Sequence, residues 1–252
     1  MSEIIPLADL HTHTVYSHGE GTIEQNIQAA ISRGLQAVAI AEHGPSHRAY
    51  GIRGKRLQRY LDEIALMQDR YAGIIRILAG IEANILSLDG RTDVDDGLAQ
   101  RLDFVVLGYH RTGISPNPID WLAFYPMGTL KKRPVQGLKQ REKNTRAFLN
   151  AMAKTRVDAL AHPNRGAECN LEELAAACAA RGIWMEINNR DDAFSVEGIA
   201  MAKRLGAKFL LSSDAHRPQD VGELTSAIHR AKQAGLVPRD IVNVVGGQAF
   251  DL

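Results

Sequence analysis

The segment I-P-L-A-D-L-H-T-H-T, residues 5–14, joins a short apolar run to two histidines, and this combination decides the fold. Six further apolar runs repeat along the chain and end in polar residues. They span residues 36–41, 75–81, 103–109, 157–161, 183–187 and 208–213. Short, nearly continuous apolar runs are typical of parallel strands that are buried on both faces. The sequence therefore predicts seven buried strands, the first of them over residues 5–10.

Helical patterns with recognisable ends lie between the predicted strands. Thr22, with Gln25 three residues further on, indicates a capping box, and Gly34 indicates the end of that helix. Pro238 suits the first turn of a terminal helix. The other predicted helices run from Asn170 to Gly182, from Ser195 to Gly206, over 54–72 and over 138–155.

Seven strands that alternate with helices predict either an α/β barrel or a doubly wound sheet. An open sheet binds ligands at a switch point, near only some strand ends. A barrel directs the carboxyl end of every strand to one mouth. Because ligand-type residues follow nearly every apolar run, we expect an α/β barrel. We expect one domain over residues 1–252, with the active site at the C-terminal ends of the strands.

The connection over residues 112–137 is longer than the others and rich in Pro and Gly. Long loops at a barrel mouth often contact the substrate, so we expect a binding loop, with a plain surface insertion as the alternative. We expect it to contact the remote part of the substrate more than the reacting group. Its aromatic and basic side chains are Trp121, Phe124, Tyr125, Lys131, Lys132 and Arg133.

Composition and charge narrow the class of protein. Hydrophobic residues make up 45% and charged residues 23% of the 252 residues, as in ordinary soluble domains. A net charge of +1 gives no strong signal for nucleic acid, and no apolar run is long enough to cross a bilayer. The N-terminal residues lack the pattern of a signal peptide, and Cys169 and Cys178 indicate free thiols. We therefore expect a cytoplasmic protein, and the sequence leaves its oligomeric state open.

Residues of the types that bind metals lie at or just after the ends of the apolar runs. His11 and His13 follow the first run, and Asp214 and His216 repeat their spacing after the last. Side chains two apart on a strand project from the same face, and in a closed barrel the first and last strands are neighbours, so these pairs are expected to meet. The other such residues are His18, Glu42, His43, Glu82, His110, His162, Glu186 and Asn188.

A lone histidine at a strand end is more often structural or solvated than a metal ligand. Seven of the nine histidines, however, follow strand ends. Clustered imidazoles desolvate one another, and a bound metal is the usual compensation. Of the other two, we expect His229 on a helix surface, and His47 either in solvent or near the mouth.

Imidazole and carboxylate together suit Zn, Fe or Mn better than Ca or Mg. Nine candidate ligands exceed the capacity of one ion, so we expect two or three divalent transition ions with room for water. Their positive charge exceeds that of Glu82 and Asp214. The excess favours an anionic substrate and a bound hydroxide.

The motifs of the chain resemble those of the PHP family, the polymerase and histidinol phosphatase superfamily. The motifs are D-L-H-T-H-T (9–14), A-E-H-G (41–44), G-I-E-A (80–83), G-Y-H (108–110), A-H-P-N-R (161–165) and S-D-A-H (213–216). They keep the order of the family and cover essentially the whole chain. The resemblance implies a distorted (β/α)7 barrel with a trinuclear metal site.

Carried over by position, the resemblance implies three ligand sets with Glu82 as a bridge. They are His11, His13, Glu82 and Asp214; Glu82, His110 and His162; and His18, His43 and His216. The motif A-E-H departs from the usual T-D-H, and the longer Glu42 is expected to orient the imidazole of His43. Many members have an acid in place of His18.

Freestanding members of the family resemble phosphatases, so the first hypothesis is hydrolysis of small phosphomonoesters by a metal-bridging hydroxide. The expected catalytic residues are Glu82, as the metal bridge, and Asp214 and His216, in proton transfer. Arg165 and Arg190 follow their strands and are candidate phosphate clamps, with surface salt bridges as the alternative.

Three other functions stay open. The same metals could serve a phosphodiesterase or 3'-5' exonuclease, for which the aromatic and basic residues of 112–137 offer only a small track. An amidohydrolase also begins with H-x-H and ends with Asp, but it usually bridges its metals with a lysine where this chain has Glu82. A non-catalytic metal-binding regulatory protein would bind metal without turnover.

Overall fold

A computed structural model describes residues 3–110, 112, 113, 115 and 134–247. Seven parallel strands follow one another around a single sheet in the order of the sequence. They are β1 (Ala8–Thr12), β2 (Ala37–His43), β3 (Arg76–Asn84), β4 (Phe104–Gly108), β5 (Ala159–Leu160), β6 (Trp184–Asn188) and β7 (Phe209–Ser212). All seven coincide with the predicted strands to within a few residues. The (β/α)7 barrel is therefore confirmed.

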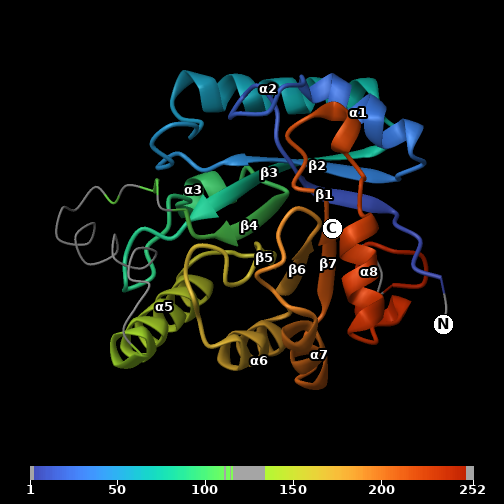
Figure 1. Cartoon of the computed structure of the whole chain (residues 1–252). Coiled ribbons are helices and arrows are strands. Elements are labelled where there is room, and N and C mark those ends of the chain that lie inside the picture. Colours follow the sequence, from blue (N-terminus) through green and yellow to red (C-terminus); the bar gives the residue numbers. More distant parts are fainter. Residues whose placement is uncertain (1–2, 111, 114, 116–133, 248–252) are drawn as a thin grey trace.

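Helices surround the barrel, with α1 and α2 on one side and α5 to α8 on the other (Figure 1). They are α1 (Ile23–Ser32), α2 (Lys55–Arg70), α3 (Asp96–Ala99), α5 (Pro134–Lys154), α6 (Leu171–Arg181), α7 (Val196–Arg204) and α8 (Thr225–Gln233). The capping box of Thr22 and Gln25 is present, and Ser195 caps α7. No helix in the described part of the chain is long and apolar enough to span a membrane.

Two boundaries differ from the sequence prediction. Pro238 begins a 3-10 turn of three residues, Pro238–Asp240, and not a terminal helix. This turn ends where Ile241 pairs with Phe209 beside β7, so the sheet ends the helical pattern. The predicted loop 112–137 stops earlier than expected, because α5 already begins at Pro134.

The barrel is nearly closed, and side chains complete the seam between β1 and β7. The backbone N–H of His13 donates to Ala215 O at 2.8 Å, next to a single bridge between the strands. The carboxylate of Asp9 accepts from Ser213 N at 3.1 Å and from Gly222 N at 2.8 Å. The expected meeting of the first and last strands is therefore confirmed.

The inner face of the barrel is apolar at the amino ends of the strands and polar at the carboxyl ends. On β2, Ala39 and Ala41 line the apolar floor, and His43 continues the same face. On β3, Leu78 belongs to the floor and Glu82 lies four residues above it. Because side chains alternate along a strand, each inward stripe carries its packing residues below and its chemistry above.

Candidate metal centre

A shift in register lets β1 place two histidines at the mouth. The pairing of β1 with β2 is irregular between Asp9 and Thr12. Such a bulge adds one residue and reverses the alternation of side chains. Leu10 consequently packs in the floor, while the next residue, His11, also faces the interior and is followed there by His13.

Backbone strain accompanies two of the expected ligands. His162 has a φ of 23° and Asp214 a φ of 52°, both in the left-handed region that non-glycine residues avoid. Such conformations persist where the surroundings over-determine them, and they gather at functional sites. Each follows directly on a short strand, so the turn redirects a side chain towards the barrel axis.

Five imidazoles surround the carboxylate of Glu82, which is 1% exposed. Its Oε1 lies 2.8 Å from His162 Nε2 and 3.2 Å from His110 Nε2. The imidazole nitrogens that face Oε2 are His43 Nδ1 at 2.8 Å, His11 Nε2 at 3.6 Å and His13 Nε2 at 3.7 Å. The two oxygens thus face different sets of histidines, which is the arrangement that a bridging ligand requires.

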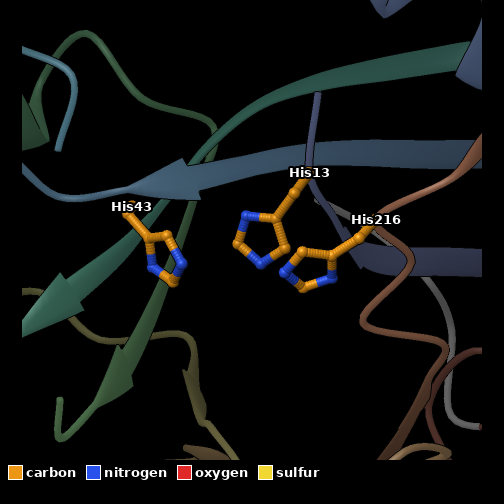
Figure 2. A group of neighbouring side chains, drawn as sticks. All are labelled: His13, His43 and His216. Atoms are coloured by element: carbon orange, nitrogen blue, oxygen red, sulfur yellow. The ribbon is translucent and has the colours of Figure 1, made fainter. Parts of the chain in front are cut away.

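The last strand completes the cluster. Asp214 Oδ1 lies 3.3 Å from His13 Nε2. Figure 2 shows the rings of His13, His43 and His216 side by side, from the segment after β1, from β2 and from the segment after β7. The ring centroid of His216 lies 4.6 Å from that of His13 and 4.1 Å from that of His18. The structure therefore brings all nine expected ligands to one mouth.

The cluster fits divalent transition metals by its donors and by its unsatisfied atoms. In the described part of the chain, four buried imidazole nitrogens make no hydrogen bond of good geometry, although three of them face the Glu82 carboxylate, and a buried polar atom without a partner is costly. They are His11 Nε2, His13 Nε2, His18 Nδ1 and His43 Nδ1. A metal ion is the partner that satisfies several such lone pairs at once, and imidazole with carboxylate selects transition ions.

Three groups of ligand atoms in the described residues lie close enough to share an ion. One is His11, His13 and Asp214, which falls within the first expected set. The other two are His43, Glu82 and His110, and His13, His43 and His216. His13 and His43 each belong to two groups. The geometry therefore supports a metal-binding cluster but does not assign each ligand to one ion.

Electrostatics divides the histidines into two sides. On the imidazole side, defined as His18, His43 and His216, burial lowers the pKa, to about 3 for His18 and about 4 for the other two. Neighbouring imidazoles lower the pKa further in each case. These rings are neutral at pH 7, as metal binding requires.

The acidic side, defined as His11, His13 and His162, behaves in the opposite way. Burial opposes the charged form, but the nearby carboxylates of Asp214 and Glu42 raise the pKa of His13 to about 9. Glu186 and Glu82 likewise raise the pKa of His11. The pKa of His162 is also raised, so at all three rings protons compete with a metal more strongly than at an ordinary imidazole.

Glu186 holds two ligands in place, a role that its position near the end of the sixth predicted strand did not reveal. Its Oε1 lies 2.6 Å from His11 Nδ1 and accepts from Ser212 Oγ at 2.6 Å. Its Oε2 accepts from the backbone N–H of His162 at 2.5 Å. A carboxylate behind a ligating imidazole fixes its tautomer and raises its basicity.

Glu42 does not orient His43, so that expectation is wrong. Neighbouring residues on β2 face opposite sides of the strand, and the Glu42 side chain points away from His43. Its carboxylate accepts from Thr14 N at 2.9 Å and from the hydroxyls of Thr14 and Ser17. The nearest imidazole nitrogen is His13 Nδ1 at 3.8 Å.

The two arginines differ in their access to the site. Arg165 lines the cavity of 150 Å³ in front of the cluster, and its Nη1 lies 3.3 Å from Asp214 Oδ2. Arg190 lies outside that cavity and donates from Nη1 to Asp214 O at 3.0 Å, with His216 Nδ1 also in contact. Arg190 lines a neighbouring cleft of 440 Å³ that shares His216. A cavity of 540 Å³ at the amino ends of the strands is remote from these groups.

His47 is buried at the mouth. Its ring stacks on that of His43 at 4.5 Å, and its Nε2 contacts Thr112 Oγ1 at 2.5 Å. Next to it, Tyr50 is 42% exposed and stacks on His18 at 4.3 Å. His229 is exposed on α8, as expected.

Some expectations are settled and others lie beyond the described residues. Cys169 and Cys178 are free and buried, as expected. Most of the predicted binding loop lies outside the described residues, including its aromatic and basic side chains. Its contact with a substrate therefore stays a prediction.

The fold and the site define the class of the protein, a metal-dependent phosphoesterase built on a parallel barrel. The family model of the PHP domain matches residues 9–190, and the chain belongs to this family.

A probable phosphatase of Syntrophotalea carbinolica is 31% identical over 246 residues, covering 93% of this chain and 90% of the relative. A probable phosphatase of Thermoanaerobacter sp. (strain X514) is 29% identical over 250 residues, covering 95% of this chain and 91% of the relative.

Among solved structures, the chain is similar to the histidinol phosphate phosphatase of Lactococcus lactis complexed with zinc, L-histidinol and phosphate. The TM-score is 0.60 at 20% identity, covering 92% of this chain and 95% of that one. At this identity the likeness supports the fold, which agrees with the barrel described above.

Proposed function

We propose that the chain is a phosphatase that hydrolyses small phosphomonoesters with two or three divalent transition ions, Zn, Mn or Fe. The observation that carries this proposal is the convergence of seven imidazoles and two carboxylates on one small cavity beside an arginine. The curated relatives named probable phosphatases, and the Lactococcus enzyme with its bound phosphate, support the same reaction.

The ligand sets proposed for the ions follow the motifs of the family. They are His11, His13, Glu82 and Asp214; Glu82, His110 and His162; and His18, His43 and His216. When bound, such ions would activate water as the nucleophile and neutralise charge on the phosphoryl oxygens. Glu82 faces two sets of histidines with its two oxygens, which supports its role as the bridge.

Two kinds of side chain would act on the substrate directly. Arg165 lines the cavity with half of its side chain exposed, so its guanidinium can bind a phosphoryl oxygen while it keeps its contact with Asp214. Asp214 lines the cavity, His216 lines both the cavity and the neighbouring cleft, and we assign these two residues the proton transfer to the leaving oxygen. Arg190 contacts both Asp214 O and His216 Nδ1. It therefore supports the position of these two residues, in addition to any contact with phosphate.

The surroundings of the cavity favour a small, polar leaving group. The cavity of 150 Å³ is suited to a phosphoryl group, and the cleft of 440 Å³ beside His216 offers room for the rest. The charged residues of this cleft are Glu20, Asp220, Glu223, Arg190 and Arg217. Three carboxylates and two guanidinium groups do not form the basic groove that a polyanionic strand needs, so a monoester is a better candidate than a nucleic-acid end.

A turnover assay of the metal-loaded protein tests the proposal. The panel would contain an aryl phosphate, histidinol phosphate, sugar phosphates, a phosphodiester and a single-stranded oligonucleotide. We expect hydrolysis of monoesters and at least a tenfold lower kcat/KM for the diester and the oligonucleotide. Faster cleavage of the diester or the oligonucleotide would overturn the monoester assignment. Two or three bound ions without any turnover would leave a metal-binding regulatory protein.

A further inference from the structure

The contact between His110 and Asn84 differs from the other contacts around Glu82. His110 Nδ1 lies 2.8 Å from Asn84 Oδ1, while His110 Nε2 lies 3.2 Å from Glu82 Oε1. The side chain of His110 is 18% exposed, whereas the other four imidazoles around Glu82 are at most 6% exposed. Packing restrains His110 least, so its orientation depends most on this hydrogen bond.

Asn84 is held in turn by the buried carboxylate of Asp93. Asn84 Nδ2 donates to Asp93 Oδ2 at 2.6 Å, and the backbone N–H of Asn84 donates to Asp93 Oδ1 at 2.7 Å. The backbone N–H of Ser46 is a third donor, to Oδ2 at 2.9 Å. Burial raises the pKa of Asp93, and these three donors oppose that rise.

This arrangement determines which way the amide of Asn84 points. Both oxygens of Asp93 accept from backbone N–H groups, so the NH2 group of Asn84 faces Asp93. The carbonyl oxygen of Asn84 then faces His110, and His110 donates from Nδ1. A metal ion could therefore bind His110 only through Nε2, the nitrogen directed at Glu82.

Asp93 also connects the ends of two strands that carry ligands. A Cβ atom at Gly44, directly after His43, would lie 2.5 Å from Asp93 Oδ2. The glycine of the A-E-H-G motif thus leaves the space that the carboxylate occupies, while Gly44 N donates to Glu82 O at 2.9 Å. Asp93 thereby fixes the end of β2 against the end of β3.

We propose that Asp93 and Asn84 are positioning residues that hold His110 in its Nδ1–H form with Nε2 towards Glu82. In this way they set the affinity of the ion assigned to Glu82, His110 and His162. The effect on affinity rests on the proposed metal centre, but the tautomer of His110 does not. The two parts therefore have separate tests.

The first test observes His110 in chelated protein by long-range 1H–15N NMR with 15N-labelled histidine, using His110→Gln to identify its signals. We expect the Nδ1–H form in the unsubstituted protein. In Asn84→Leu we expect a mixture of tautomers, because the acceptor is lost. Asp93→Asn replaces one acceptor oxygen with a donor, and it should also increase the Nε2–H form. An unprotonated Nδ1 of His110 in the unsubstituted protein, or the same protonation of Nδ1 in both variants, overturns the proposal.

The second test is a zinc titration of the chelated protein against a competing chelator. Asn84→Leu should weaken one ion by about 10- to 100-fold and leave the others unchanged. The matched control is Asn144→Leu, which removes a buried amide that donates to Glu168 O at 2.7 Å in the outer layer. Equal affinities in Asn84→Leu and the control would overturn the effect on affinity. If the unsubstituted protein binds no zinc, the proposed function fails, while the tautomer still decides the positioning role.

Discussion

The two sides of the cluster use the same ligand in different surroundings. On the acidic side, Glu186 backs the ring of His11, and the pKa of His13 is raised to about 9. On the imidazole side, His18 and His216 pack against other rings, and their pKa values fall to about 3 and 4. Protons therefore compete with a metal more strongly on the first side than on the second. The comparison shows that buried partners, and not the ligand type, set how each side responds to pH.

Glu82 faces both sides and lies close to five imidazoles, so its loss is expected to have the largest effect. Glu82→Gln removes a negative charge that five imidazoles surround, and the amide cannot bridge two ions. We expect the loss of at least one ion per chain and a fall in kcat/KM of more than about 100-fold. Elemental analysis and a phosphatase assay measure these. His229→Ala, an exposed histidine, is the control, and full metal with full turnover in Glu82→Gln would refute the bridge.

Glu186→Gln tests the acidic side alone. The amide keeps the shape but weakens the hold on His11 Nδ1, so the metal on this side should bind about 10- to 100-fold more weakly. The ligands of the imidazole side should keep their affinity. Glu197→Gln, an exposed glutamate of α7, is the matched control. Equal weakening of every ion would show that the two sides do not bind independently.

Arg165→Ala tests substrate binding at the rim of the cavity. Loss of a charge-assisted hydrogen bond should raise KM by about tenfold, with metal content unchanged. Arg190→Ala is expected to act more on kcat, because Arg190 contacts Asp214 O and His216 outside the cavity. Steady-state kinetics separate the two, with Arg204→Ala on the outer surface as control. A larger KM effect in Arg190→Ala would reverse the assignment.

The smallest expected effect is on the pH dependence of unfolding in chelated protein. The folded pKa of His18 lies near 3, below its ordinary value of 6.5, so the unfolded chain binds more protons between these values. Stability is therefore lost as the pH falls below about 6.5. His18→Ala should reduce this acid loss, as measured by urea unfolding between pH 7 and pH 4.5. An unchanged slope would show that His18 does not contribute.

The opposite sign is expected for the acidic side. His13 has a folded pKa of about 9, so its stabilising contribution is present below pH 6.5 and is lost as the pH rises through 9. His13→Gln should remove this alkaline loss in the same unfolding series between pH 7 and pH 9.5. A loss of equal size in the variant would contradict the pKa assigned to His13.

The sequence was most informative at the ends of the strands, where core residues and metal-ligand candidates follow one another. The paired histidines at 11 and 13 predicted the mouth, and in the structure His43 and Glu82 continue the apolar inner faces of β2 and β3. Asn84 lies two residues beyond Glu82 on the same face, and that spacing was a signal that could have been used. Asp93 had no such signal, because it sits among the acidic residues of 91–96 and reaches Asn84 only when the segment folds back on β3.

The sequence was least informative where one sequence pattern is compatible with two different structures. Glu42 and His43 are adjacent in A-E-H, but adjacency on a strand places their side chains on opposite faces. Arg165 and Arg190 both follow a strand in the sequence. Their positions along the chain therefore did not show that Arg165 would line the cavity and Arg190 the neighbouring cleft. Pro238 is compatible with the start of a helix, but the 3-10 turn ends after three residues because Ile241 pairs with Phe209 of β7.

The seam of the barrel has a consequence for how the chain resists unfolding. β1 and β7 are the first and last strands, and few backbone hydrogen bonds join them. An ion shared by His11, His13 and Asp214 would close a loop of about 200 residues, which in the unfolded chain costs several kcal/mol of conformational entropy. Such an ion acts as a removable cross-link between the two ends of the domain. Chelation would then open the protein along this seam first, and amide hydrogen exchange would be fastest in β1 and β7.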